Sequence, residues 1–465
     1  MKKRIVYLLL LALALVACNE DEGGAVAPAE LIRSITVGAQ NENALRMEIH
    51  LEFKKEVSYQ IEYWKAGDET ASRLSHVSAP VTSDKCTLVL LRAQSDYNFR
   101  VHVRAGTQSS SSDVYKFTTG VIAARVPVPS LFEDKITQPL PGYLLLTKND
   151  KPGVVIMTDT EGEVVWYQLF EEPIRVATFD ALTNTVSCII GPNSIQPFAG
   201  SRMFVMDLYG KVLLDKNVES LTPHHEIKRL PDGDFLLVRF VAKKFDLTAQ
   251  GGGKEETVFG DGLMVMDIQG NIKWEWDCFG EVNPADDPNI MGKIEMLQMN
   301  YRDDWSHANS ADRDEEGNYY ITFNWSSELW KIDGKTKKVI YRLGKNGNVD
   351  MPQEAYMEGI HCVTALSRNQ VLVFDNGQQT HLSRGLTFTV NDVSRKAELA
   401  HSITLPSEYG SPFQGSVERI SEDLYLFGPT MSNSILFMSA QGDILRSFKT
   451  MSQTYRTQYI AKIEL

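Results

Sequence analysis

A two-part segment recurs six times after residue 130 and limits what the chain can fold into. An apolar strand, such as Val186 to Ile190, is followed by a turn and strand of the form D-x-x-G-x-h-h (h, hydrophobic), such as DLYGKVLL at Asp207. The six turns begin 48 to 66 residues apart, at Asp159, Asp207, Asp267, Asp333, Asn391 and Ser439. This is the spacing of four-stranded propeller blades with insertions. The repeat predicts an all-β protein whose main domain is a six-bladed β-propeller.

An apolar strand precedes each turn, and the alternation of the two segment types argues against a stack of unrelated hairpins. A single four-stranded sheet cannot bury both faces, whereas six sheets packed radially cover one another and keep their edges short. The preceding strands are predicted at 143–146, 186–190, 235–238, 319–322, 371–374 and 424–427.

The chain divides into five segments: a leader (1–18), a flexible tether (19–29), a small β domain (30–120), a Pro-containing linker (121–130) and the propeller (131–465). Period-two alternation predicts strands in the β domain at 44–53, 58–64, 85–91 and 97–105. The run from Leu90 to Gly120 resembles the closing half of a fibronectin type III domain, which implies a β-sandwich. We expect this module to support, position or dimerise the propeller, so a homodimer is one expected partner state.

The leader has a basic start, MKKR, an apolar core from Ile5 to Leu15, and Leu15-Val16-Ala17-Cys18 at its end. This pattern resembles the lipobox of bacterial lipoproteins, which implies cleavage before Cys18 and lipidation of that residue. A plain secretory signal with an incidental Cys is the alternative. We therefore expect a lipid-anchored protein of the bacterial envelope, in the outer membrane, facing either the periplasm or the outside.

Charge and cysteine content exclude some classes of function. The net charge of -13 argues against nucleic-acid binding, which needs clustered Lys and Arg, but leaves a small anionic substrate open. The other cysteines, Cys86, Cys188, Cys278 and Cys362, form no CxxC pattern, and we interpret them as buried thiols. Two insertions are also expected to be irregular: a loop at 243–260, and a short helix or lid at 280–305 carrying Met291, Met296 and Met299.

Three histidine-bearing segments align by their strands, and the alignment predicts one shared site. His225, Asn309 and His361 fall at equivalent positions in the third, fourth and fifth blades, and His307 lies two residues before Asn309. In a propeller, such positions face the central channel. Strand alternation predicts that Glu226 and Cys362 face away from the site.

The residues alone leave the chemistry of this cluster open. Zinc is one option, but no carboxylate or thiol stands at the expected position, so we predict no metal. A serine hydrolase lacks the G-x-S-x-G elbow. A binding site is another option. In group transfer, a neutral imidazole would attack an electrophile while neighbouring His and Asn side chains stabilise its oxygens.

Five motifs in order resemble the bacterial aryl-sulfate sulfotransferases over about residues 30 to 465. These are HHEIKRLPDGD, DWSHANS, IHCV with FDNG, SRGLTFTV, and SPFQGSVERI. The resemblance implies a six-bladed propeller that moves a sulfuryl group from a phenolic sulfate ester to a phenol. It implies a phenolic sulfate donor and a phenol acceptor as partners, and no nucleotide or other cofactor.

The resemblance also implies residue roles. His361 matches the transiently sulfated nucleophile, and His225, His307 and Asn309 match the residues that hold the sulfuryl oxygens and assist proton transfer. His224, Asn324, Arg384 and Trp305 are predicted to bind substrate, with Trp325 and Tyr356 as further aromatic candidates.

Asn324 departs from the family pattern, because it stands where family members can carry an arginine. Another cation, Arg239 or Arg384, is expected to substitute, or the substrate differs. The alternative function is a catalytically weak or inactive propeller that binds sulfated glycans or phenolic sulfates at the cell surface.

Overall fold

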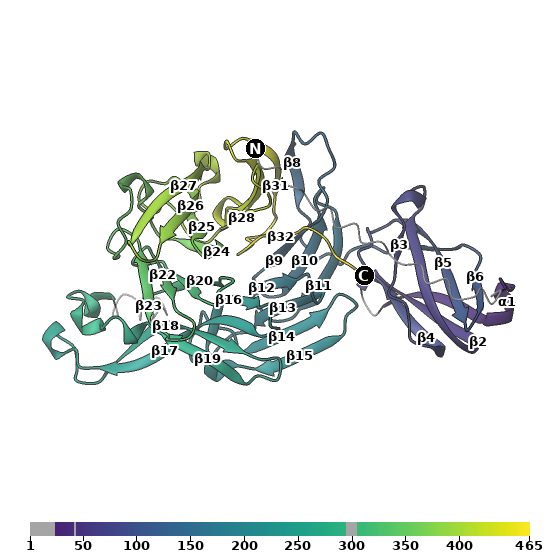
Figure 1. The fold of residues 1–465 in the computed structure, drawn as a ribbon, viewed down its shortest axis with the longest axis horizontal. Coiled ribbons are helices and arrows are strands. Elements are labelled where there is room, and N and C mark those ends of the chain that lie inside the picture. The colour runs from purple at the N-terminus through teal and green to yellow at the C-terminus, as the bar shows by residue number, and fades with distance from the viewer. Residues whose placement is uncertain (1–23, 41–42, 294–304) are drawn as a thin grey trace, which may run out of the picture. The chain divides into compact units, whose positions relative to one another are not determined.

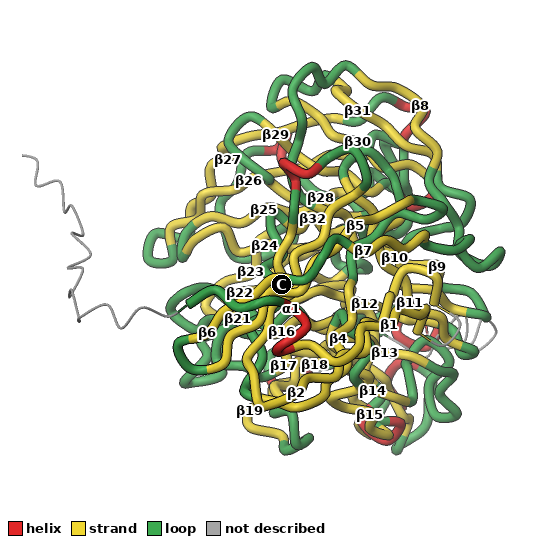
Figure 2. The backbone as a smooth tube through the Cα atoms, turned by 90° about the vertical axis from the view of Figure 1, so that its right-hand side faces the viewer, coloured by secondary structure: helices red, strands yellow, loops and turns green. Residues whose placement is uncertain are grey.

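The computed structural model describes residues 24–40, 43–293 and 305–465 (Figure 1). Strands dominate, and helices are limited to short pieces (Figure 2). The chain forms two compact units: one comprises residues up to Gly38, Met47–Leu88 and Ser95–Thr118, and the other comprises Ala39–Arg46, Val89–Gln94 and Thr119–Leu465. None of the helices in the described ranges has the length and apolar character needed to cross a bilayer. The predicted leader, including Cys18, lies outside the described residues.

The N-terminal unit is a curled β-sheet built around one long strand, β2 (Asn43–Lys65). The first part of β2 pairs with β4 and its second part pairs with β5, so that two predicted strands are a single continuous strand. Its inward residues alternate, as the sandwich prediction requires. The other elements are α1 (Pro28–Leu31), β1 (Ile32–Gln40), β3 (Arg73–Leu74), β4 (Val81–Leu88), β5 (Asp96–Ala105), β6 (Gln108–Ser111) and β7 (Tyr115–Thr118).

The second unit is a six-bladed β-propeller, as predicted, and each blade is one antiparallel sheet. Blade one comprises β9 (Tyr143–Lys148), β10 (Gly153–Asp159), β11 (Val164–Phe170) and β32 (Gln458–Ile460). Blade two comprises β12 (Ile174–Asp180), β13 (Thr185–Ile190), β14 (Arg202–Asp207) and β15 (Val212–Asn217). Blade three comprises β16 (Pro223–Arg229), β17 (Phe235–Phe245), β18 (Glu256–Met266) and β19 (Ile272–Asp277). Blade four comprises β20 (Ala308–Arg313), β21 (Tyr319–Phe323), β22 (Glu328–Ile332) and β23 (Val339–Leu343). Blade five comprises β24 (His361–Ser367), β25 (Gln370–Asp375), β26 (Arg384–Asn391) and β27 (Lys396–Thr404). Blade six comprises β28 (Ser416–Arg419), β29 (Leu424–Gly428), β30 (Ser434–Ser439), β31 (Ile444–Lys449) and β8 (Ser130–Asp134).

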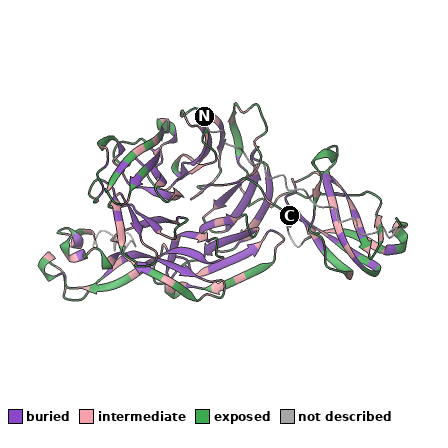
Figure 3. Ribbon diagram, viewed as in Figure 1, coloured by how far each residue is buried: buried purple, intermediate pink, exposed green. Residues whose placement is uncertain are grey.

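The propeller is held together by apolar clusters between neighbouring blades, and the blade strands are buried over most of their length (Figure 3). One cluster lies at each of the six blade junctions, for example around Trp166 between blades one and two and around Phe437 between blades six and one. The ring closes where the late strand β32 pairs with β9. Six interblade cores therefore replace a single central core and leave the channel to polar side chains.

The recurring Asp and Gly have a direct structural reason. In blade one, the Asp159 carboxylate accepts hydrogen bonds from the backbone N–H groups of Glu161 and Glu163, both at 3.0 Å. Gly162 has a φ of 93°, which costs other residues conformational strain. The motif thus builds the tight turn between the third and fourth strands of a blade.

Two sequence predictions need correction. The expected loop at 243–260 is shorter than predicted: it covers 246–255, because β17 and β18 continue as a paired hairpin out to Phe245 and Glu256. The end of the expected linker is also structured, since β8 pairs with β31 and adds a fifth strand to blade six. In the insertion at 280–305, a helix begins at Ile290, while Met296 and Met299 lie outside the described residues.

Candidate active site

The innermost strands of blades three, four and five begin at the same end of the channel and bring three histidines together. His225 lies near the start of β16, His307 precedes β20, and His361 opens β24. The ring centroids of His225 and His307 are 5.4 Å apart, and both residues act electrostatically on His361. The structure therefore assembles the predicted histidine cluster.

The register of these strands corrects the alignment from which the cluster was predicted. His361 pairs with Phe374 in the neighbouring strand, and the equivalent residues in blades three and four are His224 and Ala308. Irregular pairing follows at once in all three strands, so simple alternation fails there. Cys362 and Glu226 line a cavity of about 280 Å³ in the channel whose lining includes none of the three site histidines.

Three residues at these strand starts have left-handed backbone conformations, which are unfavourable for residues other than glycine. The φ angles are 55° at His225, 53° at His307 and 46° at Cys362. Each costs about 1–2 kcal/mol, and such strain is concentrated at functional sites. The strained backbone directs side chains from adjacent blades into one place.

Asn376, which follows β25, fixes the tautomer of His361. Its Nδ2 donates to the carbonyl oxygens of Ser411 and Gln414, both at 2.6 Å, so its Oδ1 must face His361. His361 Nδ1 lies 2.6 Å from that oxygen and therefore carries the ring proton. The lone pair of His361 is then on Nε2, where the backbone N–H of Gln414 approaches to 3.3 Å.

His361 is neutral as well as oriented. It is 4% exposed, and burial lowers its pKa to about 3, with a smaller lowering by His307 and Arg456 that the hydrogen bond to Asn376 partly offsets. A neutral imidazole with its Nε2 lone pair available is the nucleophilic form of histidine.

His225 has a different support, which begins at a buried carboxylate in β18. Asp261 Oδ1 lies 3.0 Å from His224 Nε2, and His224 Nδ1 lies 2.5 Å from His225 Nδ1. Asp261 and His224 are fully buried, and the His224 ring stacks on Phe240 at a centroid distance of 3.7 Å. With the His224 proton on Nε2, His225 donates from Nδ1 and keeps its own lone pair on Nε2.

The same carboxylate connects blade three to blade four beside His307. Asp261 accepts hydrogen bonds from the hydroxyl of Ser306 and from the backbone N–H of Ala308 at 2.9 Å. Burial alone would raise the pKa of Asp261, but the adjacent His224 imidazole holds it below its ordinary value. Burial lowers the pKa of His225, and the neighbouring His224 and His307 lower it further.

Asn309 is fully buried and has one unused polar atom. Its Nδ2 donates to the Ile360 carbonyl at 3.3 Å, whereas its Oδ1 has no hydrogen-bond partner within the described part of the chain. Its backbone carbonyl accepts hydrogen bonds from Tyr455 at 3.1 Å and from Arg456 at 2.5 Å.

Tyr455 and Arg456 were not predicted from the sequence. They precede β32 and enter the site because that strand closes the ring against β9. The Tyr455 ring lies 5.5 Å from that of His225, and Arg456 forms an ion pair with Glu226 at 2.7 Å. Among the arginines of the described residues, Arg456 acts electrostatically on both His225 and His361.

Of the predicted substrate-binding residues, some lie beside the histidine cluster and others are held elsewhere. Asn324 is buried beside the cluster, with its N–H donating to the His307 carbonyl at 2.9 Å, and its Nδ2 has no partner among the described residues. Arg384 is held by Asp375 at 2.5 Å and by two backbone carbonyls, and Arg239 by Glu275 at 2.7 Å. Neither arginine is available to replace the missing one.

His224 supports His225 rather than facing a substrate. Trp305 lines a separate pocket, where its indole N–H donates to Asp287 at 3.1 Å. Tyr356 packs in the core between blades four and five, whereas the ring of the half-exposed Trp325 lies 5.3 Å from that of His307. The four predicted thiols are buried and unpaired, and no metal-binding group of three or more His, Cys, Asp or Glu occurs in the ranges that the structure describes.

Fold and site together define a class: a six-bladed propeller with a buried, oriented histidine cluster at one end of its channel. The family model for arylsulfotransferase (ASST) matches residues 130–453. The chain belongs to the arylsulfotransferase family and is, in its general activity, a sulfotransferase acting on aryl compounds.

Other comparisons add little to this assignment. No curated protein matches the sequence significantly. A protein of unknown function from Bacteroides caccae is similar in structure, with a TM-score of 0.45, 9% identity, and coverage of 69% of this chain and 100% of that one. Virginiamycin B lyase from Staphylococcus aureus has a TM-score of 0.35, 11% identity, and coverage of 68% and 88%. Both similarities are too low to support a conclusion about function.

Proposed function

We propose that the protein transfers a sulfuryl group from a phenolic sulfate ester to a phenol by a ping-pong mechanism through sulfo-His361. One observation carries the proposal: His361 is buried and neutral, and Asn376 fixes its proton on Nδ1, which places the lone pair on Nε2, where it accepts a long hydrogen bond from the Gln414 N–H that substrate must displace. This is the activated state that covalent catalysis by histidine requires.

In the first half-reaction, Nε2 attacks the sulfur, the N–S bond forms and the S–O bond to the aryl group breaks. The leaving phenoxide takes a proton from His307, which lies beside His225 and interacts with the carboxylate of Asp261. In the second half-reaction, the acceptor phenol gives its proton to the same histidine pair while its oxygen attacks the sulfur, and the N–S bond breaks. The Nδ1 proton stays hydrogen-bonded to Asn376 Oδ1 throughout.

The sulfuryl oxygens need donors near Nε2. The Gln414 N–H already points at Nε2, and the unpaired Nδ2 of Asn324 is a second candidate. Arg456 supplies the positive field that Arg239 and Arg384 cannot, although Glu226 offsets part of it. Preorganised donors of this kind are the largest contribution to many acyl and phosphoryl transfers, and the same reasoning applies to sulfuryl transfer.

Intact-protein mass spectrometry after mixing with para-nitrophenyl sulfate tests the proposal. We expect the mass to rise by one sulfuryl group, with release of one equivalent of nitrophenolate, and to return to its original value when a phenol is added. The adduct should be absent in His361→Ala and present in His50→Ala, which changes an exposed histidine of the N-terminal unit. A folded wild-type protein that forms no adduct with any aryl sulfate would contradict the proposal.

A second candidate function is supported by Asn324, which leaves the site without the arginine of the family pattern. In that case the propeller binds sulfated glycans or phenolic sulfates without turnover. Calorimetry would then show saturable binding of the sulfate ester, and neither nitrophenolate nor a protein adduct would appear.

We also propose that the protein is tethered to the bacterial envelope through lipid on Cys18, with either side of the outer membrane as its location. The leader motif supports this proposal. Labelling with a radioactive fatty acid should mark the wild-type protein and not Cys18→Ser. Label in the variant would contradict a lipid on Cys18.

A further inference from the structure

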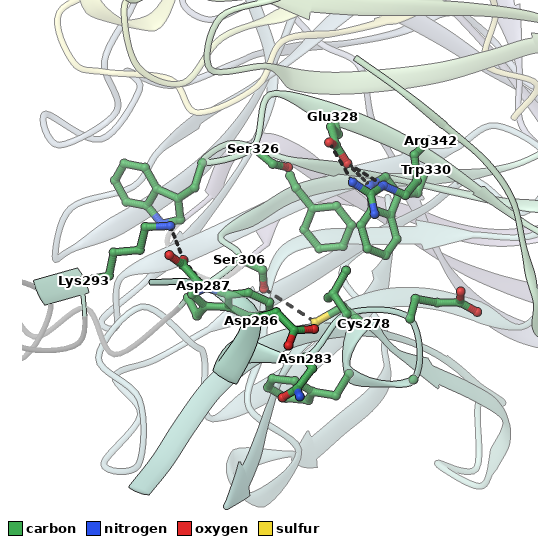
Figure 4. A pocket seen from close by; sticks show the side chains of 17 residues that line it. Cys278, Asn283, Asp286, Asp287, Lys293, Ser306, Ser326, Glu328, Trp330 and Arg342 are labelled. Carbon is green, nitrogen blue, oxygen red and sulfur yellow. Dashed lines mark hydrogen bonds and ion pairs between the residues drawn. The ribbon is translucent and has the colours of Figure 1, made fainter. Parts of the chain in front are cut away.

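A pocket of about 640 Å³ opens between blades three and four next to the histidine cluster (Figure 4). Its described walls come from the segment after β19, from Trp305 and Ser306, and from the turn between β21 and β22. This volume is in the range of sites that enclose most of a small organic ligand.

Aromatic rings form much of the wall. Phe279 and Trp305 lie nearly parallel, with an interplanar angle of 6°, and Trp325 is half-exposed. Phe323 and Trp330, whose ring centroids are 4.7 Å apart, also line the pocket. Such surfaces bind planar aromatic groups through stacking and burial of apolar area.

The pocket adjoins the candidate active site at two residues. Ser306 precedes His307 in the chain and donates to Asp261, the carboxylate that supports His224. Trp325 lines the pocket and also contacts the His307 ring. The pocket therefore lies beside His307 at this end, separated from it by the Trp325 ring and Ser306.

The charges on the described part of the wall are not balanced. Glu328 is matched by Arg342 at 3.0 Å and Asp287 by Lys293 at 2.5 Å. Glu281 and Asp286 remain, both exposed, and no Lys or Arg of the described residues pairs with either. A negatively charged sulfate is repelled by this wall, whereas a cationic group is attracted.

We propose that this pocket holds the aromatic body of the phenol during transfer and favours phenols that carry a cationic amine, with Glu281 and Asp286 as the residues that determine this preference. The proposal rests on the proposed sulfotransferase function. The phenolic oxygen points toward His307 and His361, and the amine lies toward the acidic rim. No bond other than those of the sulfuryl transfer forms or breaks.

Three para-substituted phenols of similar size provide the test: tyramine, which is cationic, para-ethylphenol, which is neutral, and para-hydroxyphenylpropionate, which is anionic. In a ping-pong reaction, kcat/KM for the acceptor reports the second half-reaction alone. We expect kcat/KM to fall in the order tyramine, ethylphenol, propionate. Exposed ion pairs contribute up to about 1 kcal/mol each. Neutralising both carboxylates should therefore lower the ratio of kcat/KM for tyramine to kcat/KM for the propionate about tenfold.

The variant is Glu281→Gln/Asp286→Asn, and the matched control is Glu422→Gln/Asp423→Asn, which removes two exposed carboxylates from blade six. The control should keep the wild-type order. Ser326→Trp, which places a ring in the pocket, should weaken all three acceptors.

The outcomes separate the two proposals. Absence of the nitrophenolate burst in the wild-type protein contradicts the proposed function itself. A normal burst with equal kcat/KM for the three phenols overturns the pocket proposal. The pocket proposal is also overturned if the double variant keeps the wild-type order of acceptors, or if Ser326→Trp leaves kcat/KM unchanged for all three.

Discussion

The two sides of the histidine cluster support their imidazoles in chemically different ways. In blade five, His361 is held by the neutral amide of Asn376, whose orientation two backbone carbonyls fix. In blade three, His225 is held through His224 by the carboxylate of Asp261. An uncharged amide fixes a tautomer and only partly offsets the effect of burial on the pKa, whereas a carboxylate carries a full negative charge that stabilises a nearby imidazolium. The difference suits His361 to nucleophilic attack and the adjacent pair of His225 and His307, beside the carboxylate, to proton transfer.

Removing the nucleophile should have the largest effect. His361→Ala should abolish both the sulfuryl adduct and steady-state transfer, whereas His225→Ala should still form the adduct from para-nitrophenyl sulfate, because nitrophenolate leaves without a proton. Rapid-quench mass spectrometry measures both. An adduct in His361→Ala would reverse the assigned roles.

Exchanging the amide support should come next. Asn376→Leu removes the acceptor for Nδ1–H, and we expect adduct formation to slow about 10²-fold because the tautomer is no longer fixed. Asn376→Asp restores an acceptor but adds a negative charge that raises the pKa of His361. Its adduct formation should therefore decline as the pH falls through a range in which the wild-type rate is constant. Equal pH profiles for the Asn376→Asp variant and the wild-type protein would show that the amide has no special role.

Removing the carboxylate support should have a smaller and selective effect. Asp261→Asn should slow transfer about tenfold for donors whose phenol is a poor leaving group, because these need a proton, and should change little with para-nitrophenyl sulfate. The dependence of the donor half-reaction on leaving-group pKa measures this selectivity. A uniform loss for all donors would indicate a purely structural role for Asp261.

The histidines should also make stability depend on pH. The pKa of His361 is about 3 in the folded protein and 6.5 in its ordinary state, so the unfolded chain binds the proton more readily. Stability is complete above pH 6.5 and is lost as the pH falls toward 3, at about 1.4 kcal/mol per pH unit for this group. Chemical denaturation should show a free energy of unfolding about 2 kcal/mol lower at about pH 5 than at neutral pH. The His361→Gln variant should lack this difference. An unchanged dependence in that variant would contradict burial of a neutral His361.

The sequence was sufficient for the architecture because the blades repeat local patterns. The Asp-Gly turns and the apolar strands depend on a few adjacent residues, and all six pairs appear in the blades. It was also sufficient to bring His225, His307 and His361 together. The alignment behind that prediction was inexact, because bulges at the strand starts depend on backbone strain that residue types do not reveal.

The supporting residues could not be predicted, because they come from contacts between distant segments. Asp261 reaches His224 from the third strand of the blade, and Asn376 lies in an Asp-Asn-Gly sequence that is typical of an ordinary turn. Arg456 follows all the repeats and carries no motif. The sequence directed attention to Arg384 and Arg239, whose carboxylate partners become visible only in three dimensions.

Ring closure by β32 also has a consequence for the timing of activity during biosynthesis. Tyr455 and Arg456 contact Asn309 and Glu226 only when the segment after blade six has been made and has paired with β9. A nascent chain that has completed blades two to six still lacks these residues at its histidine cluster, because β32 is the last strand of blade one to be made. The protein therefore acquires its complete site in one late event, after the last blade has been translated.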